Sequence, residues 1–280
     1  MSAPLPILVY HSVSDHVSTA LRRYSISPAR FRAHLDLIAA SEIRVVTVST
    51  AVERLSTGFS EPIVALSFDD AFADFAEEAL PALREHGMPA TLYVPTAYIG
   101  STAKWLERET ESPPRMMSWA QLREAAAAGI ELGAHSHSHL ELDRLDPETL
   151  ALETERPKAL LEQELGREVR SFAYPFGYHS GRVRRAVRDA GYSSACAVGN
   201  LTVTSGENRF ALSRWTVADT MGPDDLRQLL SRRTSGPERA ITAGKRLVWQ
   251  SRRRWLPRAR ALTAPVVTGT SERTRQRETL

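Results

Sequence analysis

The amino-acid sequence predicts an α/β fold in which parallel strands form a barrel. Short apolar runs rich in β-branched residues alternate with longer segments of helical pattern. The runs are almost continuously apolar, as expected for strands that are buried on both faces of a sheet. Such alternation is typical of a βα barrel or a doubly wound sheet, and about seven runs suit a barrel.

The predicted strands are runs in which Val, Ile, Leu, Ala and aromatic side chains dominate. In chain order they cover residues 6–11, 44–48, 62–68, 90–94, 130–134, 171–174 and 193–198. In folds of this class the chemistry lies at the carboxyl ends of the strands. The residues that follow each run are therefore the first candidates for a functional site.

The predicted helices lie between these runs and carry the start and stop signals of helices. They cover residues 74–87, 118–129 and 146–166. The second opens on Ser118 as an N-cap and ends at Gly129, and the third opens on Asp146 followed by proline. Pro157 lies inside the third segment and predicts a kink or a break in that helix.

The length and composition fit one large domain with a well-buried core. The chain has 280 residues, of which 42% are hydrophobic and 25% charged. Cys196 is the only cysteine, which excludes an internal disulfide and a cysteine-rich zinc module. The first residues lack the basic region of a signal peptide, and no run reaches the roughly 18 apolar residues of a spanning helix. We therefore expect the mature protein to start at residue 1 and to lie in the cytoplasm.

The charges are distributed unevenly. The net charge is +3, yet residues 231–260 hold ten basic residues and a single acidic one, Glu238. We therefore expect a catalytic domain over residues 1–230 and a basic C-terminal tail over residues 231–280. The tail mixes arginines with Trp249 and Trp255, which is typical of a segment lying on an anionic membrane surface. The alternative is a helix packed on the barrel, followed by a disordered end. No base-reading motif accompanies the basic run, so no nucleic-acid partner is expected.

Candidate site residues stand at the ends of four of the predicted strands. Asp69 and Asp70 follow residues 62–68, His135 follows residues 130–134, and His11 ends the first run. The run 171–174 is followed by Pro-Phe-Gly. Each of these has a structural explanation when taken alone, such as an N-cap or a hydrogen-bonded histidine. Their convergence on one rim of the barrel is what indicates a site.

The segment His-Ser-His-Ser-His places three histidines at residues 135, 137 and 139. An extended chain would put all three on one face, whereas a turn or helix would pair His135 with His139 and send His137 elsewhere. Together with Asp70, the pair would offer two nitrogens and one oxygen to a divalent metal and leave positions open for water and substrate. Zn²⁺ is the default metal, and Co²⁺, Ni²⁺ and Fe²⁺ suit the same ligands.

Other enzyme classes fit less well. Two histidines and a carboxylate also form the iron site of non-haem oxygenases, but the usual order of those ligands along the chain is absent. A phosphoryl-transfer enzyme is excluded by the lack of a glycine-rich phosphate loop.

Three motifs in order resemble those of the polysaccharide deacetylases of carbohydrate esterase family 4. SFDDAFADF resembles the family's aspartate motif TFDDG, HSHSH resembles its metal motif H-[ST]-x-x-H, and FAYPFG resembles its substrate-groove motif R-x-P-x-G. The helix around ETERPKALLEQELG also fits. The similarity covers roughly residues 5 to 220, and it implies a distorted (β/α)7 barrel that hydrolyses an acetamide on a sugar.

The resemblance assigns a role to each matching residue. Asp69 becomes the general base, and Asp70, His135 and His139 the metal ligands. The usual late histidine motif is absent, and ILVYH at residues 7–11 looks like its counterpart moved to the front, as in the circularly permuted branch that handles poly-N-acetylglucosamine. His11 is accordingly assigned as the catalytic acid. His137 falls on a variable position of the motif.

Two positions depart from the family pattern. Ala71 replaces the glycine after the aspartates, a mild change if the backbone φ there is negative. Ala173 stands where many members have an arginine that orients the catalytic aspartate, and Arg214 can supply this guanidinium from another strand.

The resemblance also implies an acetylated amino-sugar glycan as substrate. The residues expected to bind it are Tyr174, Pro175, Phe176, Gly177, Arg214 and Trp215. Trp215 and Tyr178 offer aromatic faces for sugar rings, although a lone aromatic is more often part of the core. The alternative function is a barrel of the same fold that binds saccharide without turnover.

Overall fold

The computed structural model describes residues 5–244 except residues 20, 59, 233 and 243. The predictions for the tail beyond Gly244, including its membrane-binding segment, lie outside the described residues. Within them, no helix combines the length and the apolar character needed to cross a bilayer.

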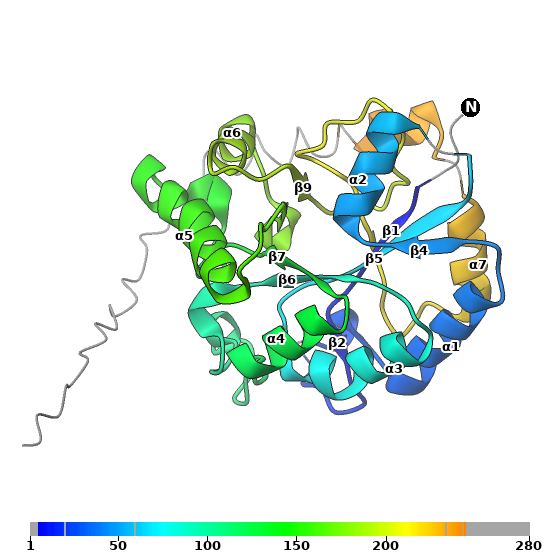
Figure 1. The fold of residues 1–280 in the computed structure, drawn as a ribbon, viewed down its shortest axis with the longest axis horizontal. Coiled ribbons are helices and arrows are strands. Elements are labelled where there is room, and N and C mark those ends of the chain that lie inside the picture. The colour runs from blue at the N-terminus through cyan, green and yellow to red at the C-terminus, as the bar shows by residue number, and fades with distance from the viewer. Residues whose placement is uncertain (1–4, 20, 59, 233, 243, 245–280) are drawn as a thin grey trace, which may run out of the picture.

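Parallel strands curl into a barrel that is surrounded by helices (Figure 1). The strands of the main sheet are β1 (Ile7–Tyr10), β4 (Arg44–Val46), β5 (Ile63–Phe68), β6 (Thr91–Val94), β7 (Glu131–Ala134), β8 (Ser171–Ala173), β9 (Ser194–Cys196) and β10 (Trp215–Thr216). Their order is β10-β1-β5-β6-β7-β8-β9, with β4 paired to β5. A separate small sheet pairs β2 (Ser12–Val13) with β3 (Ser25–Ile26).

The segment 212–217 joins the two edges of this sheet. At one end, Leu212 exchanges backbone hydrogen bonds with Ala195 and Ala197 of the β9 region, at 3.0 and 2.7 Å. At the other end, β10 pairs in parallel with β1. The ring of strands is therefore closed, as the predicted barrel requires. The sequence analysis did not predict β10, because a two-residue strand has no apolar run to reveal it.

The predicted strands agree with the structure to within one or two residues at each end. The run 44–48 differs for a clear reason, because only its first three residues form β4. The side chain of Thr47 accepts a hydrogen bond from the backbone N–H of Thr50 and so begins a helix. β4 lies beside the first half of β5, and β6 lies beside the second half.

The helices surround the barrel (Figure 1). They are α1 (Pro28–Ala39), α2 (Val48–Thr57), α3 (Leu80–Glu85), α4 (Trp119–Ala127), α5 (Pro147–Leu165), α6 (Gly181–Asp189) and α7 (Pro223–Ser231). The predicted helix at 74–87 consists of a π-helical turn, Phe75–Ala79, followed by α3. Of the two outcomes predicted for Pro157, a break is wrong, because α5 runs through this residue, and a kink stays a prediction. Pro157 is buried, and its packing offsets part of the cost of the missing backbone hydrogen bond.

The alternation of side chains along the strands separates two apolar clusters. Leu8, Leu66 and Leu92 belong to the large cluster that includes residues of the surrounding helices. Ile7 and Ala65 belong to a smaller cluster with Tyr93, Ala173 and Cys196. Because side chains two apart on a strand share a face, His11, Asp69 and His135 continue the series of this second face beyond the strand ends.

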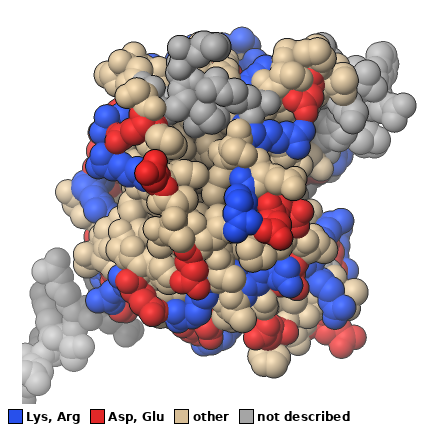
Figure 2. All heavy atoms as spheres, turned by 90° about the vertical axis from the view of Figure 1, so that its right-hand side faces the viewer, with Lys and Arg blue, Asp and Glu red and all other residues tan. Residues whose placement is uncertain are grey.

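The outer face that carries α1 and α7 has charges of both signs (Figure 2). Ion pairs on it include Arg30 with Asp219 and Arg32 with Glu85. A surface of this mixed kind is typical of solvated helices.

Candidate active site

A cavity of about 250 Å³ lies at the carboxyl ends of the strands. All five residues predicted to be catalytic or metal-binding line it, namely His11, Asp69, Asp70, His135 and His139. They come from the ends of β1, β5 and β7, as the rule for parallel strands predicts.

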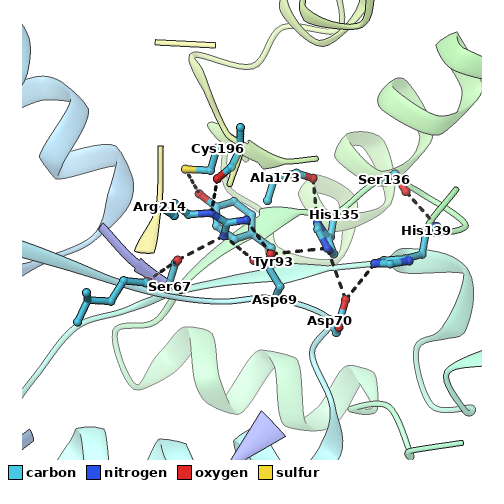
Figure 3. Close-up of polar contacts among 12 residues, drawn as sticks. Ser67, Asp69, Asp70, Tyr93, His135, Ser136, His139, Ala173, Cys196 and Arg214 are labelled. Atoms are coloured by element: carbon cyan, nitrogen blue, oxygen red, sulfur yellow. Dashed lines mark hydrogen bonds and ion pairs between the residues drawn. The ribbon is translucent and has the colours of Figure 1, made fainter. Parts of the chain in front are cut away.

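Asp69 is held by Arg214 through two parallel hydrogen bonds (Figure 3). Nη1 donates to Oδ1 at 2.6 Å and Nη2 donates to Oδ2 at 2.7 Å. The guanidinium is fully buried, and its Nε donates to the carbonyl of Ala197 at 3.1 Å. The contact between Arg214 and Asp69, which the sequence only raised as an option, is therefore present. Burial would raise the pKa of Asp69, but Arg214 and His135 hold it below its usual value.

Asp70 faces two imidazoles. Its Oδ1 lies 3.1 Å from Nε2 of His139 and 3.4 Å from Nε2 of His135. One ligand atom from each of the three side chains lies within 4.8 Å of the others, and all three residues are buried. Nδ1 of His135 donates to the carbonyl of Ala173 at 2.8 Å, so the Nε2 of the neutral ring carries a lone pair towards the carboxylate.

The electrostatics of this group favour positive charge. Burial alone would lower the pKa of His135, but Asp69 and Asp70 raise it above its usual value. A carboxylate oxygen and imidazole lone pairs that converge in a buried space repel one another unless a proton or a cation lies between them. The three side chains can therefore hold a divalent metal.

The segment 135–139 forms a turn, so the extended alternative is wrong. Ser136 has φ 61° and His139 has φ 55°, both in the left-handed region. The turn brings His135 and His139 together and directs His137 away, where its Nδ1 lies 2.8 Å from Oγ1 of Thr96. Burial, with a smaller effect of Arg156, lowers the pKa of His137 to about 4, so this ring is neutral near pH 7.

His11 lines the cavity at the end of β1, next to the end of β5, and is half-buried. Its ring is 5.1 Å from that of Tyr24. Burial lowers the pKa of His11, although Asp70 and Asp69 oppose this effect. The ring is therefore largely neutral near pH 7.

Two of the six residues predicted to bind substrate line the cavity, namely Phe176 and Gly177, and so does Tyr178. Tyr174 is buried, does not line the cavity and donates its hydroxyl hydrogen to the carbonyl of Phe210 at 2.9 Å. Pro175 is also buried and does not line the cavity.

Arg214 and Trp215 do not line the cavity either. Thr216 lines it, and Trp215 points to the other face because side chains alternate along β10. Arg214 shares the face of Thr216 but is fully buried. The ring of Trp215 instead lies 5.2 Å from the guanidinium of Arg232.

Gly177 is required by its surroundings. Its φ is 73°, and a Cβ at this position would lie 2.9 Å from Cβ of Val198. Both the backbone conformation and the close approach exclude a side chain.

The sequence analysis missed several residues of the cavity wall. They are Leu21, Arg23, Tyr24, Trp105, Leu106, Glu109, Val198 and Thr216. Trp105 stacks on His139 with ring centroids 4.4 Å apart, and Phe176 meets the same imidazole edge-on at 4.8 Å. Trp105 belongs to the loop after β6. Because functional residues lie at the carboxyl ends of the strands, the loop that follows the run 90–94 was a place to look for it.

Comparisons with known proteins agree with this geometry. A family model described as polysaccharide deacetylase matches residues 57–195. The putative polysaccharide deacetylase YxkH of Bacillus subtilis is 28% identical over 221 residues, which cover 78% of this chain and 73% of the relative. The poly-β-1,6-N-acetyl-D-glucosamine N-deacetylase of Staphylococcus aureus is 21% identical over 212 residues, covering 72% of this chain and 71% of the relative.

Solved structures share the fold. The deacetylase PplD of Streptococcus pyogenes superposes with a TM-score of 0.72 at 21% identity and covers 83% of this chain and 100% of its own. IcaB from Ammonifex degensii gives a TM-score of 0.67 at 22% identity, covering 82% and 98%. The matched segment 57–195 contains both aspartates and both paired histidines. The chain therefore carries a polysaccharide deacetylase domain, which the family model matches over residues 57–195, and the comparisons are consistent with the hydrolases of carbohydrate esterase family 4.

Proposed function

We propose that the protein removes N-acetyl groups from saccharides that contain N-acetylglucosamine, as polymers, oligomers or lipid-linked chains. The observation that carries the proposal is Asp69, pinned by Arg214 at 2.6 and 2.7 Å, beside the buried group of Asp70, His135 and His139. A fixed carboxylate next to a metal-ligand set is the arrangement that metal-assisted hydrolysis needs.

Asp70, His135 and His139 would hold one divalent metal. The fit rests on the buried carboxylate oxygen and two imidazole nitrogens that face it, and on the charge that raises the pKa of His135. When bound, the metal would acidify a water and polarise the amide carbonyl of the substrate. Zinc is our default, and cobalt, nickel and iron suit the same nitrogen and oxygen ligands.

Asp69 is the proposed general base. Arg214 occupies one side of the carboxylate, so the remaining lone pairs of Asp69 point to the cavity that the residue lines. The lowered pKa of Asp69 keeps it ionised and ready to accept a proton, at the expense of its basicity. Fixed geometry offsets this weakness because the carboxylate needs no reorientation when water attacks the carbonyl carbon.

His11 is the proposed acid. Amide cleavage expels an amine, which leaves readily only after its nitrogen has received a proton. Because burial holds the pKa of His11 low, the ring would take up a proton from solvent during the reaction and pass it to the leaving nitrogen. Asp69 would keep the proton that the attacking water loses. The products are acetate and a glucosamine unit.

The choice of an amino sugar rests on the cavity wall and on the relatives. Trp105, Phe176 and Tyr178 line the cavity with aromatic rings, which suit the apolar faces of sugars. The Staphylococcus aureus relative carries poly-β-1,6-N-acetyl-D-glucosamine in its name. The alternative of a binding-only barrel drew on the missing arginine at position 173, and the contact of Arg214 with Asp69 weakens it.

The decisive experiment measures acetate release from N-acetylglucosamine oligomers. Metal-stripped protein is assayed with and without added Zn²⁺ or Co²⁺, beside an Asp69→Asn variant. We expect metal-dependent release by the parent and a loss of at least about 100-fold in the variant, which should still bind metal. Near-normal rates in Asp69→Asn would refute the role of this residue as base. Bound metal without release by the parent would favour the binding-only barrel or another acylated substrate.

A further inference from the structure

The loop that carries both proposed histidine ligands, residues 135–139, is a strained piece of chain. Ser136 and His139 have positive φ, a conformation that costs free energy for residues with a side chain. Such a backbone persists only when surrounding groups hold it. We call these five residues the metal loop and ask which contacts hold it.

The ends of the metal loop are held by one contact from the barrel and one contact within the loop. Nδ1 of His135 donates to the carbonyl of Ala173 at 2.8 Å. The backbone N–H of His139 donates to Oγ of Ser136 at 3.0 Å. These contacts orient the first and last residues but leave the backbone N–H groups between them to find other partners.

A carboxylate from α5 supplies those partners. Glu153 is 4% exposed, and its Oε2 accepts from the backbone N–H of His137 at 2.9 Å and from that of Ser138 at 2.7 Å. One carboxylate oxygen thus receives two hydrogen bonds at the middle of the metal loop. Bonds of this kind to a charged acceptor are about twice as strong as those between neutral groups.

Glu153 does not line the cavity. Its described hydrogen bonds go to the backbone of the metal loop, so it acts through the loop and not on the substrate. Its segment, ETERPKALLEQELG, resembles a helix of the family, and that resemblance assigns no function to the glutamate.

We propose that Glu153 is a positioning residue that sets the metal loop so that Nε2 of His135 and Nε2 of His139 face Asp70 together. The inference rests on the metal site of the proposed function and adds a residue to it. Residues that orient metal ligands from outside the ligand set typically change metal affinity by about 10-fold to 100-fold when they are mutated.

The test compares Glu153→Gln with Glu155→Gln in the full-length chain. Gln keeps the size of Glu153 but removes its charge and one acceptor. Glu155 lies two residues further along α5, is exposed and has no described hydrogen bond to the metal loop, so it serves as the matched control. Zn²⁺ affinity is measured by competition with a chromophoric chelator, and thermal unfolding is recorded on the metal-free proteins.

We expect Glu153→Gln to bind Zn²⁺ about 10-fold to 100-fold more weakly than the parent, with Glu155→Gln within twofold of the parent. A folded Glu153→Gln with unchanged Zn²⁺ affinity would overturn the inference, even if its unfolding temperature fell, because a purely structural role predicts that outcome. If Glu153→Gln does not fold, Glu153→Asp takes its place. An unchanged Zn²⁺ affinity in that variant would also contradict the positioning role.

The parent protein separates this inference from the proposed function. A parent that binds no Zn²⁺ contradicts both. A parent that binds Zn²⁺ and releases acetate, together with unchanged affinity in the Glu153 variant, contradicts the positioning role alone.

Discussion

At the scale of single residues, backbone strain gathers around the candidate site. Of the six described residues other than glycine with positive φ, five lie in segments that follow strands of the site: Asp70, Ala71, Ser136, His139 and Phe176. Ala71 has φ 54°, so the condition under which its substitution for glycine would be mild does not hold, and the conformation costs about 1 kcal/mol. Strain of this kind is common where side chains must be aimed for function.

Arg214 provides a test of how the base is tuned. In Arg214→Lys the charge remains, but the two parallel hydrogen bonds to Asp69 cannot both be made. The pKa of Asp69, which Arg214 holds low, should rise. We expect kcat to fall about 10-fold to 100-fold and the acidic limb of the profile of kcat/KM against pH to move to higher pH.

The control for this variant is Arg232→Lys, whose side chain lies over Trp215 outside the cavity. An acidic limb that stays in place in Arg214→Lys would show that Asp69 is not the group that titrates there.

At the scale of elements, a side-chain hydrogen bond connects two segments that follow β1 and β5. Ser12 of β2 donates to Oδ2 of Asp74 at 2.5 Å, just before the π-helical turn. Oδ1 of the same carboxyl is buried without a described partner. Burial, together with Glu77 and Glu78, raises the pKa of Asp74 to about 6, so ionising this group destabilises the fold.

We expect Asp74→Asn to change how stability depends on pH. Because the folded pKa lies above the unfolded value of 3.8, the group favours the folded state at low pH, and this contribution is lost as pH rises through about 6. At pH 7.5 the variant should therefore gain about 1 to 3 kcal/mol in free energy of unfolding relative to the parent, and at pH 4 almost nothing.

Urea unfolding at pH 4 and pH 7.5 measures this difference, with the exposed Asp15→Asn as the control. An equal free-energy change at both pH values in Asp74→Asn would contradict the raised pKa.

The sequence predicts the elements that depend on local pattern and misses those that depend on distant contacts. The apolar runs predict β1 and β5 because burial on both faces needs continuous hydrophobicity. β10 is paired through residues about 200 positions away and leaves no local signal. Helix α6 has its buried residues at positions 183 and 187, a helical spacing that is visible in the sequence, so this helix was predictable.

The same distinction applies to the candidate site. The positions of Asp69 and His135 follow from strand ends, so their meeting was predictable. The stacking of Trp105 on His139 depends on the path of a loop, and the contact of Arg214 with Asp69 spans 145 residues. The resemblance suggested the second pair, but only the folded chain establishes either contact.

At the scale of the whole molecule, residues beyond the boundary predicted at residue 230 still contact the barrel. Thr234 accepts a hydrogen bond from the backbone N–H of Thr202 at 2.8 Å, and Arg239 donates to the carbonyl of Thr202 at 2.5 Å. A chain that ends before Arg239 would lose contacts with the barrel. Residue 244 is therefore the better end point for testing the proposed membrane contact of the tail.

We expect the full chain to sediment with anionic vesicles at low salt and the chain ending at Gly244 to remain in the supernatant. The reason is the cluster of arginines and tryptophans beyond that residue, which suits an anionic lipid surface. Neutral vesicles are the control, and binding should weaken as salt is raised. Equal sedimentation of both chains would contradict membrane binding by the tail.

The parallel pairing of β10 with β1 has a consequence for the ancestry of such chains. Because α7 follows β10, a gene rearranged so that β1 is translated after α7 would encode an ordinary strand–helix–strand unit at the same place in the wall. His11 would then lie near the C-terminal end of the sequence, yet its side chain would occupy the same position at the carboxyl ends of the strands. The genetic order of the motifs can thus drift between relatives while selection acts on an unchanged constellation of side chains.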